Sequence, residues 1–285
     1  MHSLPRLLLR RHNRLTCSAM NMIFSFIKRK PSVAVIRLQG MIASGGNPGR
    51  LNDASLAPLI EMAFRRGKPK AVALVINSPG GSPVQSALIA ARIRRLATEV
   101  EIPVHAFVED VAASGGYWLA TAADDIFVDG NSIVGSIGVI SAGFGLHEAL
   151  SRYGVERRVY TSGKSKSQLD PFSPENPEDV ARLRSLQDQV HQNFIAQVKS
   201  RRGAKLVEDD SLFTGEFWVG NRAVELGLVD GLGHLVPMMK DRYGEKVRFR
   251  IYGMRRPLLS RLGLSLLSDT MAHAEERALY ARYGV

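Results

Sequence analysis

The sequence predicts an α/β fold in which strands alternate with helices and most strands run parallel. Three short apolar segments, residues 33–40, 71–78 and 102–109, are typical of buried strands. Apolar residues recur at helical spacing in the stretches between them. Because strands joined through helices form right-handed crossovers between parallel neighbours, this alternation indicates a largely parallel sheet.

The second half of the chain continues the same alternation. Strands are expected at 125–130, 132–140 and 155–163, with a helix near 144–153. Residues 247–254 are also strand-like. These segments extend the predicted sheet toward the end of the chain.

Asn176 is expected to begin a long helix that ends near Gly203. Its side chain can cap the helix, Pro177 suits the first helical position, and two acids then face the positive end of the helix dipole. The apolar stripe of this helix comprises Val180, Leu183, Leu186, Val190, Phe194 and Val198.

Composition favours a globular protein and argues against nucleic-acid binding. The 285 residues are 45% apolar and 23% charged, an ordinary balance. The net charge of +11 arises at the ends: the first 30 residues carry seven Lys or Arg and no acid, and residues 241–285 carry nine basic and five acidic side chains. Residues 31–240 are therefore net neutral and lack the positive surface that a phosphate backbone requires.

The basic N-terminal arm contains apolar runs that are too short for a signal-peptide core or a membrane span. It is interpreted as an organelle presequence, as an arm that contacts an anionic membrane, or as residues upstream of a start at Met20 or Met22. We expect a cytoplasmic protein or one that lies peripherally at the inner membrane surface. The only cysteine, Cys17, lies in this arm, so neither an intrachain disulfide nor a cysteine-based metal site is expected.

A Pro-Gly-Gly turn, residues 79–81, directly follows the second predicted strand. Gly80 and Gly81 allow backbone N–H groups to point outward and a substrate to approach closely. Donors fixed at a strand end can stabilise negative charge that develops on a carbonyl oxygen. The turn is therefore either an ordinary tight turn or an oxyanion hole.

Ser114 lies among small residues in the stretch VAASGGYWLA, after the third predicted strand and a short connection. If a helix begins there, its dipole favours an oxyanion at Ser114, and the flanking alanines and glycines clear space around the hydroxyl. Alone, the serine could simply cap a helix. A second feature at the end of a neighbouring strand favours a ligand site, because open α/β sheets place such sites at that edge.

A serine nucleophile requires a base, and the sequence offers three candidates. His105 alternates with apolar residues inside a predicted strand, which favours a structural role. His147 lies on the polar side of a predicted helix, which favours a solvated histidine. Lys164 and Lys166 lie among hydroxyl residues, but a lysine acts as a base only when it is neutral, which requires desolvation or a nearby cation.

Five segments, taken together and in order, resemble the signal peptide peptidase A group of serine peptidases, peptidase family S49, which also includes the SohB-type proteins. The segments are INSPGG, VAASGGYWLA, VGSIGVI, SGKSKSQLDPFSP and GLVDGLG, and the resemblance covers about residues 33–237. It implies a ClpP/crotonase-like fold of repeated β-β-α units with a largely parallel sheet. It also implies a serine endopeptidase that needs no cofactor or metal and hydrolyses apolar peptides such as remnant signal peptides.

The resemblance implies a Ser–Lys dyad. Ser114 takes the place of the nucleophile, and Gly80 or Gly81 takes that of the oxyanion donor. The family's base follows a Ser-Gly pair by three residues, which places it at Lys166 and leaves Lys164 in a variable position.

Ser136 and Ser165 are expected to help position the reacting groups.

The domain boundaries follow from the same resemblance. A basic arm at 1–30 precedes a single peptidase domain at 31–237 and a basic extension at 238–285. A leucine-rich piece of the extension, residues 256–268, is interpreted as a helix that packs on the body or on a neighbouring subunit, with surface attachment as the alternative.

The resemblance also implies that chains with one copy of each motif assemble into rings, in which the serine and the lysine of one site come from neighbouring subunits. Three other hypotheses remain open. They are a crotonase-like acyl-CoA enzyme, which would use carboxylates such as Glu109 or Asp110, a catalytically silent scaffold at the membrane surface, and a ClpP-like Ser-His-Asp peptidase that uses His147.

Overall fold

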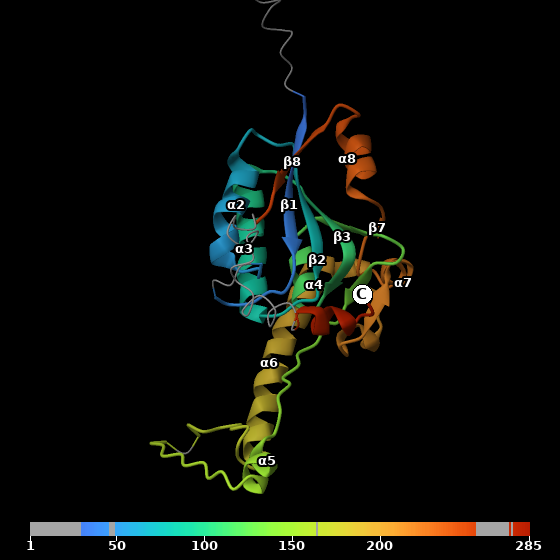
Figure 1. The fold of residues 1–285 in the computed structure, drawn as a ribbon. Helices are drawn as coiled ribbons and strands as arrows, with labels where there is room; N and C mark the ends of the chain where they lie inside the picture. Colours follow the sequence, from blue (N-terminus) through green and yellow to red (C-terminus); the bar gives the residue numbers. More distant parts are fainter. Residues whose placement is uncertain (1–29, 46–48, 164, 255–273, 275) are drawn as a thin grey trace, which may run out of the picture.

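The computed structural model describes residues 30–45, 49–163, 165–254, 274 and 276–285 (Figure 1). Their strands are β1 (Ser32–Gln39), β2 (Ala71–Ser78), β3 (Val104–Ala113), β4 (Asp125–Val128), β5 (Ile133–Gly135), β6 (Phe217–Val219), β7 (Gly231–Leu232) and β8 (Arg248–Tyr252). They form one sheet with the order β6-β5-β3-β2-β1-β8, and β4 joins it beside β3 and β7. Every pair is parallel except β5 with β6, which confirms the predicted α/β class with its largely parallel sheet.

Strand β3 is long enough to pair with two strands along the same edge. Its residues 105–108 pair with β4, and its residues 111–113 pair with β5. The second pairing places Gly135 of β5 opposite Ala113, the last residue of β3. The carboxyl end of β3 is therefore framed by β2 on one side and by β5 on the other.

Helices cover both faces of the sheet. The described helices are α2 (Asp53–Arg65), α3 (Pro83–Val100), α4 (Gly115–Ala120), α5 (His147–Arg152), α6 (Pro177–Arg202), α7 (Gly220–Glu225) and α8 (Leu235–Tyr243), with short 3-10 helices at Gly203–Lys205 and Asp210–Phe213. Alternate residues of β1 point to opposite faces: Ile36 joins a core with α2, α3 and α4, whereas Val35 joins a second core with α8. Figure 1 shows α2 and α3 on the side away from α8.

Helix α6 connects the body to a projecting arm, residues 141–176. As predicted, Asn176 caps the helix by accepting a hydrogen bond from the N–H of Glu178, and Pro177 follows it. Phe194 and Val198 of the predicted stripe are buried, but Leu186 is exposed because the first half of α6 leaves the body together with the arm (Figure 1).

Three segments differ from those that the sequence predicts, and a fourth cannot be compared. Residues 155–163 are exposed and form no strand. The segment expected at 132–140 forms a strand only at Ile133–Gly135. Strand β3 begins at Val104 and continues through Ala113, so no connection separates it from Ser114. The segment at 256–268 lies outside the described residues.

Candidate active site

Ser114 occupies a sharp turn between β3 and α4. Its backbone angles are φ +51° and ψ −121°, a conformation that is costly for a residue with a side chain. Its N–H donates to the carbonyl of Gly135 at 2.8 Å, which fixes the turn against β5. The side chain is half-buried, and its hydroxyl makes no hydrogen bond to the described residues, not even as a cap of α4. Strain and an unengaged hydroxyl together are typical of functional turns.

The glycines around Ser114 permit close backbone packing. A Cβ at Gly116 would lie 2.4 Å from the carbonyl oxygen of Ser78, and one at Gly115 would lie 2.4 Å from Ser86 Oγ. A Cβ at Gly80, where φ is +99°, would lie 2.9 Å from Ser114 Cβ. The start of α4 therefore packs directly against the end of β2 and the start of α3.

Of the two glycines in the Pro-Gly-Gly turn, Gly81 has the available amide. The N–H of Gly80 is buried and donates to Ser78 Oγ at 3.3 Å. Gly81 is exposed, and its N–H has no acceptor among the described residues. The Gly81 nitrogen lies 3.4 Å from the position of a Cβ on Gly115, so this free donor adjoins the turn that carries Ser114.

A small, mostly apolar cavity of about 20 Å³ opens beside Ser114 and Gly81. Trp118 of α4, Val139 and Phe194 of α6 contribute its apolar wall. The rings of Trp118 and Phe194 stack with their centroids 5.0 Å apart. A substrate side chain that enters this cavity would contact apolar groups.

Lys166 and Ser165 lie in the projecting arm and are exposed. The backbone N–H of Lys166 donates to the carbonyl of Gly163, but its amine has no hydrogen-bond or ion-pair partner among the described residues. Figure 1 shows the arm at the far end of α6, away from the sheet. A single chain therefore does not bring Lys166 to Ser114, and Lys164 lies outside the described residues.

Ser136 directly follows Gly135 and lies at the same sheet edge as Ser114. Its φ is +53°, and its N–H donates to the carbonyl of Glu216 at 2.6 Å. Its hydroxyl accepts a hydrogen bond from the phenol of Tyr283 at 3.3 Å. Ser136 thus fixes the start of the segment that leads to Val139 in the cavity wall.

Residues 97–242 match the family model described as "Peptidase family S49". The chain belongs to peptidase family S49. The match includes Ser114 and Lys166 and ends inside α8.

Two relatives of this S49 chain are longer proteins that it matches over part of their length. It is 49% identical over 271 residues to a protein of Brucella melitensis called "Na(+)/H(+) antiporter NhaA", a match that covers 89% of this chain and 37% of that protein. It is 33% identical over 165 residues to an Enterococcus faecium protein whose name contains "signal peptide peptidase SppA", covering 58% of this chain and 48% of that one. The chain thus spans 37% to 48% of the length of these relatives.

The fold of the S49 chain resembles that of a solved protease. A mutant of the "1510-N membrane-bound stomatin-specific protease", in complex with a substrate peptide, superposes with a TM-score of 0.51 at 15% sequence identity. The match covers 82% of this chain and 96% of that one. The ClpP-like fold expected from the sequence is confirmed.

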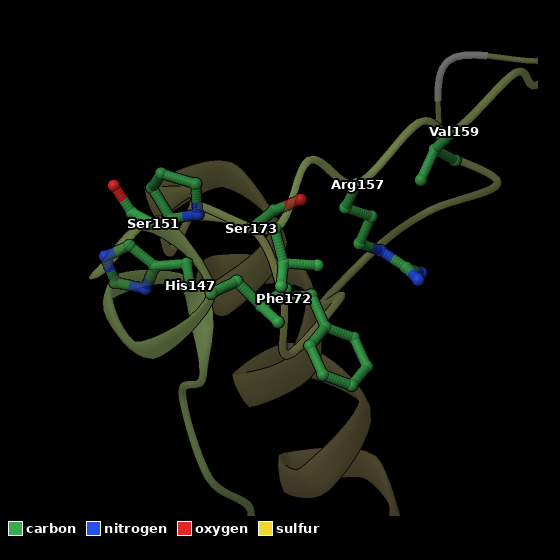
Figure 2. A pocket seen from close by; sticks show the side chains of 9 residues that line it. His147, Ser151, Arg157, Val159, Phe172 and Ser173 are labelled. Carbon is green, nitrogen blue, oxygen red and sulfur yellow. The ribbon is translucent and has the colours of Figure 1, made fainter. Parts of the chain in front are cut away.

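The two histidines considered as bases lie apart from Ser114. His147 lines a separate cavity of about 450 Å³ in the arm, where the guanidinium of Arg157 stacks on Phe172 (Figure 2). His105 is buried near the opposite end of β3 and forms hydrogen bonds with Asp125 at 2.6 Å and with the phenol of Tyr243 at 2.9 Å. These contacts give His105 a structural role, as expected.

The acids nearest to Ser114 in sequence are engaged elsewhere. Glu109 pairs with Arg37 at 2.9 Å, and Asp110 accepts a hydrogen bond from the amide of Asn77 at 2.5 Å.

Within the part of the chain that the structure describes, no group of three or more His, Cys, Asp or Glu could hold a metal ion. None of the described helices combines the length and the apolar character that crossing a membrane requires.

Trp118 and Val139 were not predicted to line the site, although they lie in the segments VAASGGYWLA and VGSIGVI. Their spacing from Ser114 and Ser136 gives no sign of a shared cavity, because the cavity forms only when α6 packs on α4. The sequence predicted that Gly80 or Gly81 supplies the oxyanion donor but not which of them. The hydrogen bond from the Gly80 N–H to Ser78 distinguishes them, because, of the two, it leaves only the Gly81 N–H without an acceptor among the described residues.

Proposed function

We propose that this chain is a serine endopeptidase with Ser114 as nucleophile, Lys166 as general base and the Gly81 N–H as oxyanion donor. The observation that carries the proposal is the turn at Ser114. There a strained serine with an unengaged hydroxyl adjoins an unengaged backbone donor and an apolar cavity. An acyl-transfer site needs these three features within reach of one carbonyl group.

In the proposed reaction, Ser114 Oγ attacks the peptide carbonyl carbon while its proton passes to the neutral amine of Lys166. The carbonyl oxygen becomes an oxyanion that accepts a hydrogen bond from the Gly81 N–H. Collapse breaks the C–N bond, and the leaving amine takes the proton from Lys166. Water then attacks the acyl-serine, gives a proton to Lys166 and releases the acid, and Ser114 recovers its proton.

Lys166 reaches Ser114 from a neighbouring copy of the chain in this proposal, as in a homo-oligomeric ring. The arm that carries Lys166 projects from the body and exposes large apolar side chains, including Phe144 at 85% and Tyr160 at 90% exposure. Exposed apolar side chains in such number are typical of a subunit interface. Packing against a neighbour would also desolvate Lys166, which favours its neutral form.

The proposed substrates are apolar peptides, such as remnants of signal peptides. The cavity beside Ser114 supports this class, because Trp118, Val139 and Phe194 offer no charged group to a side chain that enters it. Its volume of about 20 Å³ favours a small residue such as alanine before the cut, over a large aromatic one.

The test is cleavage of a panel of fluorogenic peptides, with apolar or charged residues before the cut, across pH 6 to 10. We expect Ser114→Ala and Lys166→Ala to lose at least about 10³-fold in kcat, because removing a nucleophile or its base leaves only binding and the oxyanion donor. Lys164→Ala, the matched control, is expected to keep most activity. Parent activity should rise with pH as an amine deprotonates.

Each alternative gives a different pattern in this assay. An active Lys166→Ala with an inactive Lys164→Ala would transfer the base to Lys164. An active Ser114→Ala would contradict the proposal as a whole. Preference for charged residues before the cut would contradict the substrate class but leave the dyad intact.

A further inference from the structure

The C-terminal segment, residues 276–285, packs against the sheet edge that carries Ser114. Figure 1 shows this red segment against the body, close to where α6 leaves it. Residues 276–281 are helical, and Tyr280 and Tyr283 both turn toward the sheet. They pack with Val111 and Ala113 of β3, on the face opposite α4.

Tyr283 supports the strand end beside Ser114. It is only 7% exposed, and its ring meets that of Phe217 edge to face at 5.2 Å. Its phenol donates to Ser136 Oγ at 3.3 Å. Because Ser136 follows the Gly135 carbonyl that binds the Ser114 N–H, this contact holds the segment that leads to Val139 in the cavity wall.

Tyr280 supports the other strand end at the site. Its phenol donates to the carbonyl of Asn77 at 2.7 Å, and the same carbonyl accepts the N–H of Gly40 at 2.9 Å. Asn77 begins the run that passes through Ser78 to Gly81. Burial, reinforced by nearby Glu276, raises the pKa of Tyr280 to about 12, so the donor stays protonated across the pH range in which a lysine base acts.

We propose that the C-terminal segment is a clamp that positions two strand ends beside Ser114, with Tyr280 holding the Gly81 turn and Tyr283 holding the 135–139 segment. The enzymatic part of this proposal rests on the proposed function. Both tyrosines are positioning residues, since neither touches Ser114 in the described structure. Two hydrogen bonds from one short segment thus tie the oxyanion donor and the cavity wall to a common support.

The clamp predicts a different kinetic effect for each tyrosine. Tyr280→Phe frees the turn that carries the Gly81 N–H, so kcat should fall about 10-fold with little change in KM, because the oxyanion forms only along the reaction. Tyr283→Phe frees the segment that leads to Val139, so KM should rise several-fold more than kcat falls. Arg282→Ala, a control on the exposed side of the same segment, should leave both constants unchanged.

Amide hydrogen exchange of the 285-residue chain tests the clamp independently of catalysis. Tyr280→Phe should speed exchange in residues 76–82, and Tyr283→Phe should speed exchange in residues 133–140. The Tm of the two variants should fall by the same small amount. Equal effects of the two variants on both segments would indicate general loosening and would overturn the clamp, as would unchanged exchange. A parent that shows no Ser114-dependent cleavage would refute the proposed function, and the exchange data would still decide whether the segment clamps the two strand ends.

Discussion

At the scale of single residues, the small side chains around Ser114 have two roles. They leave the hydroxyl uncovered, and they let α4 approach the backbone of β2 and the Ser86 side chain of α3 closely. Gly116 illustrates the second role, because its Cα lies against the carbonyl of Ser78. The position of the backbone turn at Ser114 therefore depends on packing two residues away.

Gly116→Ala tests this dependence. The added methyl group would lie 2.4 Å from a backbone oxygen that cannot move aside, so α4 must shift away from β2. We expect a loss of about 2 kcal/mol in the free energy of unfolding in urea, typical of overpacking. A fluorophosphonate probe should also label Ser114 several-fold more slowly.

Gly143→Ala is the matched control, because a Cβ at Gly143 has no neighbour within 4 Å. It should leave both stability and labelling unchanged. A Gly116→Ala protein with parental stability and labelling would show that the close approach has no effect on the site.

The residue pattern predicted the helix start at Ser114 and the Pro-Gly-Gly turn, because local residue types reveal both. It could not predict the contacts of Tyr280 and Tyr283, which join residues more than 140 positions apart. It also predicted a strand at 155–163 from local composition alone, whereas a strand forms only where a partner strand lies beside it.

At the scale of secondary-structure elements, the end of α6 is tied to the sheet by a partly buried ion pair. Arg202 donates to Asp230 at 2.7 Å, and Lys205 does so at 2.5 Å. Asp230 also accepts the N–H of Ile126 in β4 at 2.8 Å. Burial opposes the charged form of Asp230, but these hydrogen bonds outweigh it and lower the pKa of the carboxyl group.

Stability should therefore depend on Asp230 in a defined pH range. Because the folded-state pKa is lowered, the stabilisation is fully present above the unfolded value, about 4, and is lost as pH falls through the folded value. Asp230→Asn should cost about 3 kcal/mol in urea unfolding at pH 7, since it leaves Arg202 buried without its counter-charge. The difference from the parent should shrink below about pH 4.

Asp188→Asn, on the exposed side of α6, is the control and should change stability little at either pH. A constant difference between Asp230→Asn and the parent from pH 7 to pH 3 would show that the charge of Asp230 does not stabilise the fold.

At the scale of the whole molecule, the body and the arm divide the proposed chemistry between them. The body holds Ser114 and Gly81, and the arm holds Lys166 at the far end of α6. The sequence predicted both halves by resemblance, but one chain does not join them. Under the proposed assembly, their joining depends on packing between copies, for which a single sequence gives no spacing rule.

Mixing two inactive variants tests whether the halves meet between copies. Ser114→Ala retains the arm with its lysine, and Lys166→Ala retains the body with its serine. If sites form between subunits, co-refolded mixtures should recover about a quarter of the parental activity, because random assembly pairs an intact serine with an intact lysine at one site in four. No recovery in mixed assemblies, alongside an active parent, would indicate that each chain completes its own site.

Limited trypsin digestion supplies the control for assembly in this experiment. Arg158 and Lys166 lie in exposed parts of the arm, so trypsin should cut there quickly in dilute protein and slowly at concentrations at which the chains assemble. Equal cutting at all concentrations would show that the arm stays uncovered.

The exposed arm also bears on the lifetime of the protein in a cell. A copy that fails to find neighbours presents an extended, apolar segment of the kind that quality-control proteases recognise and degrade. Under the proposed assembly, the surface that completes a neighbour's site is the same surface that marks an orphan chain for destruction. Cells would then hold this peptidase almost entirely in its assembled form, without a separate mechanism for removing excess subunits.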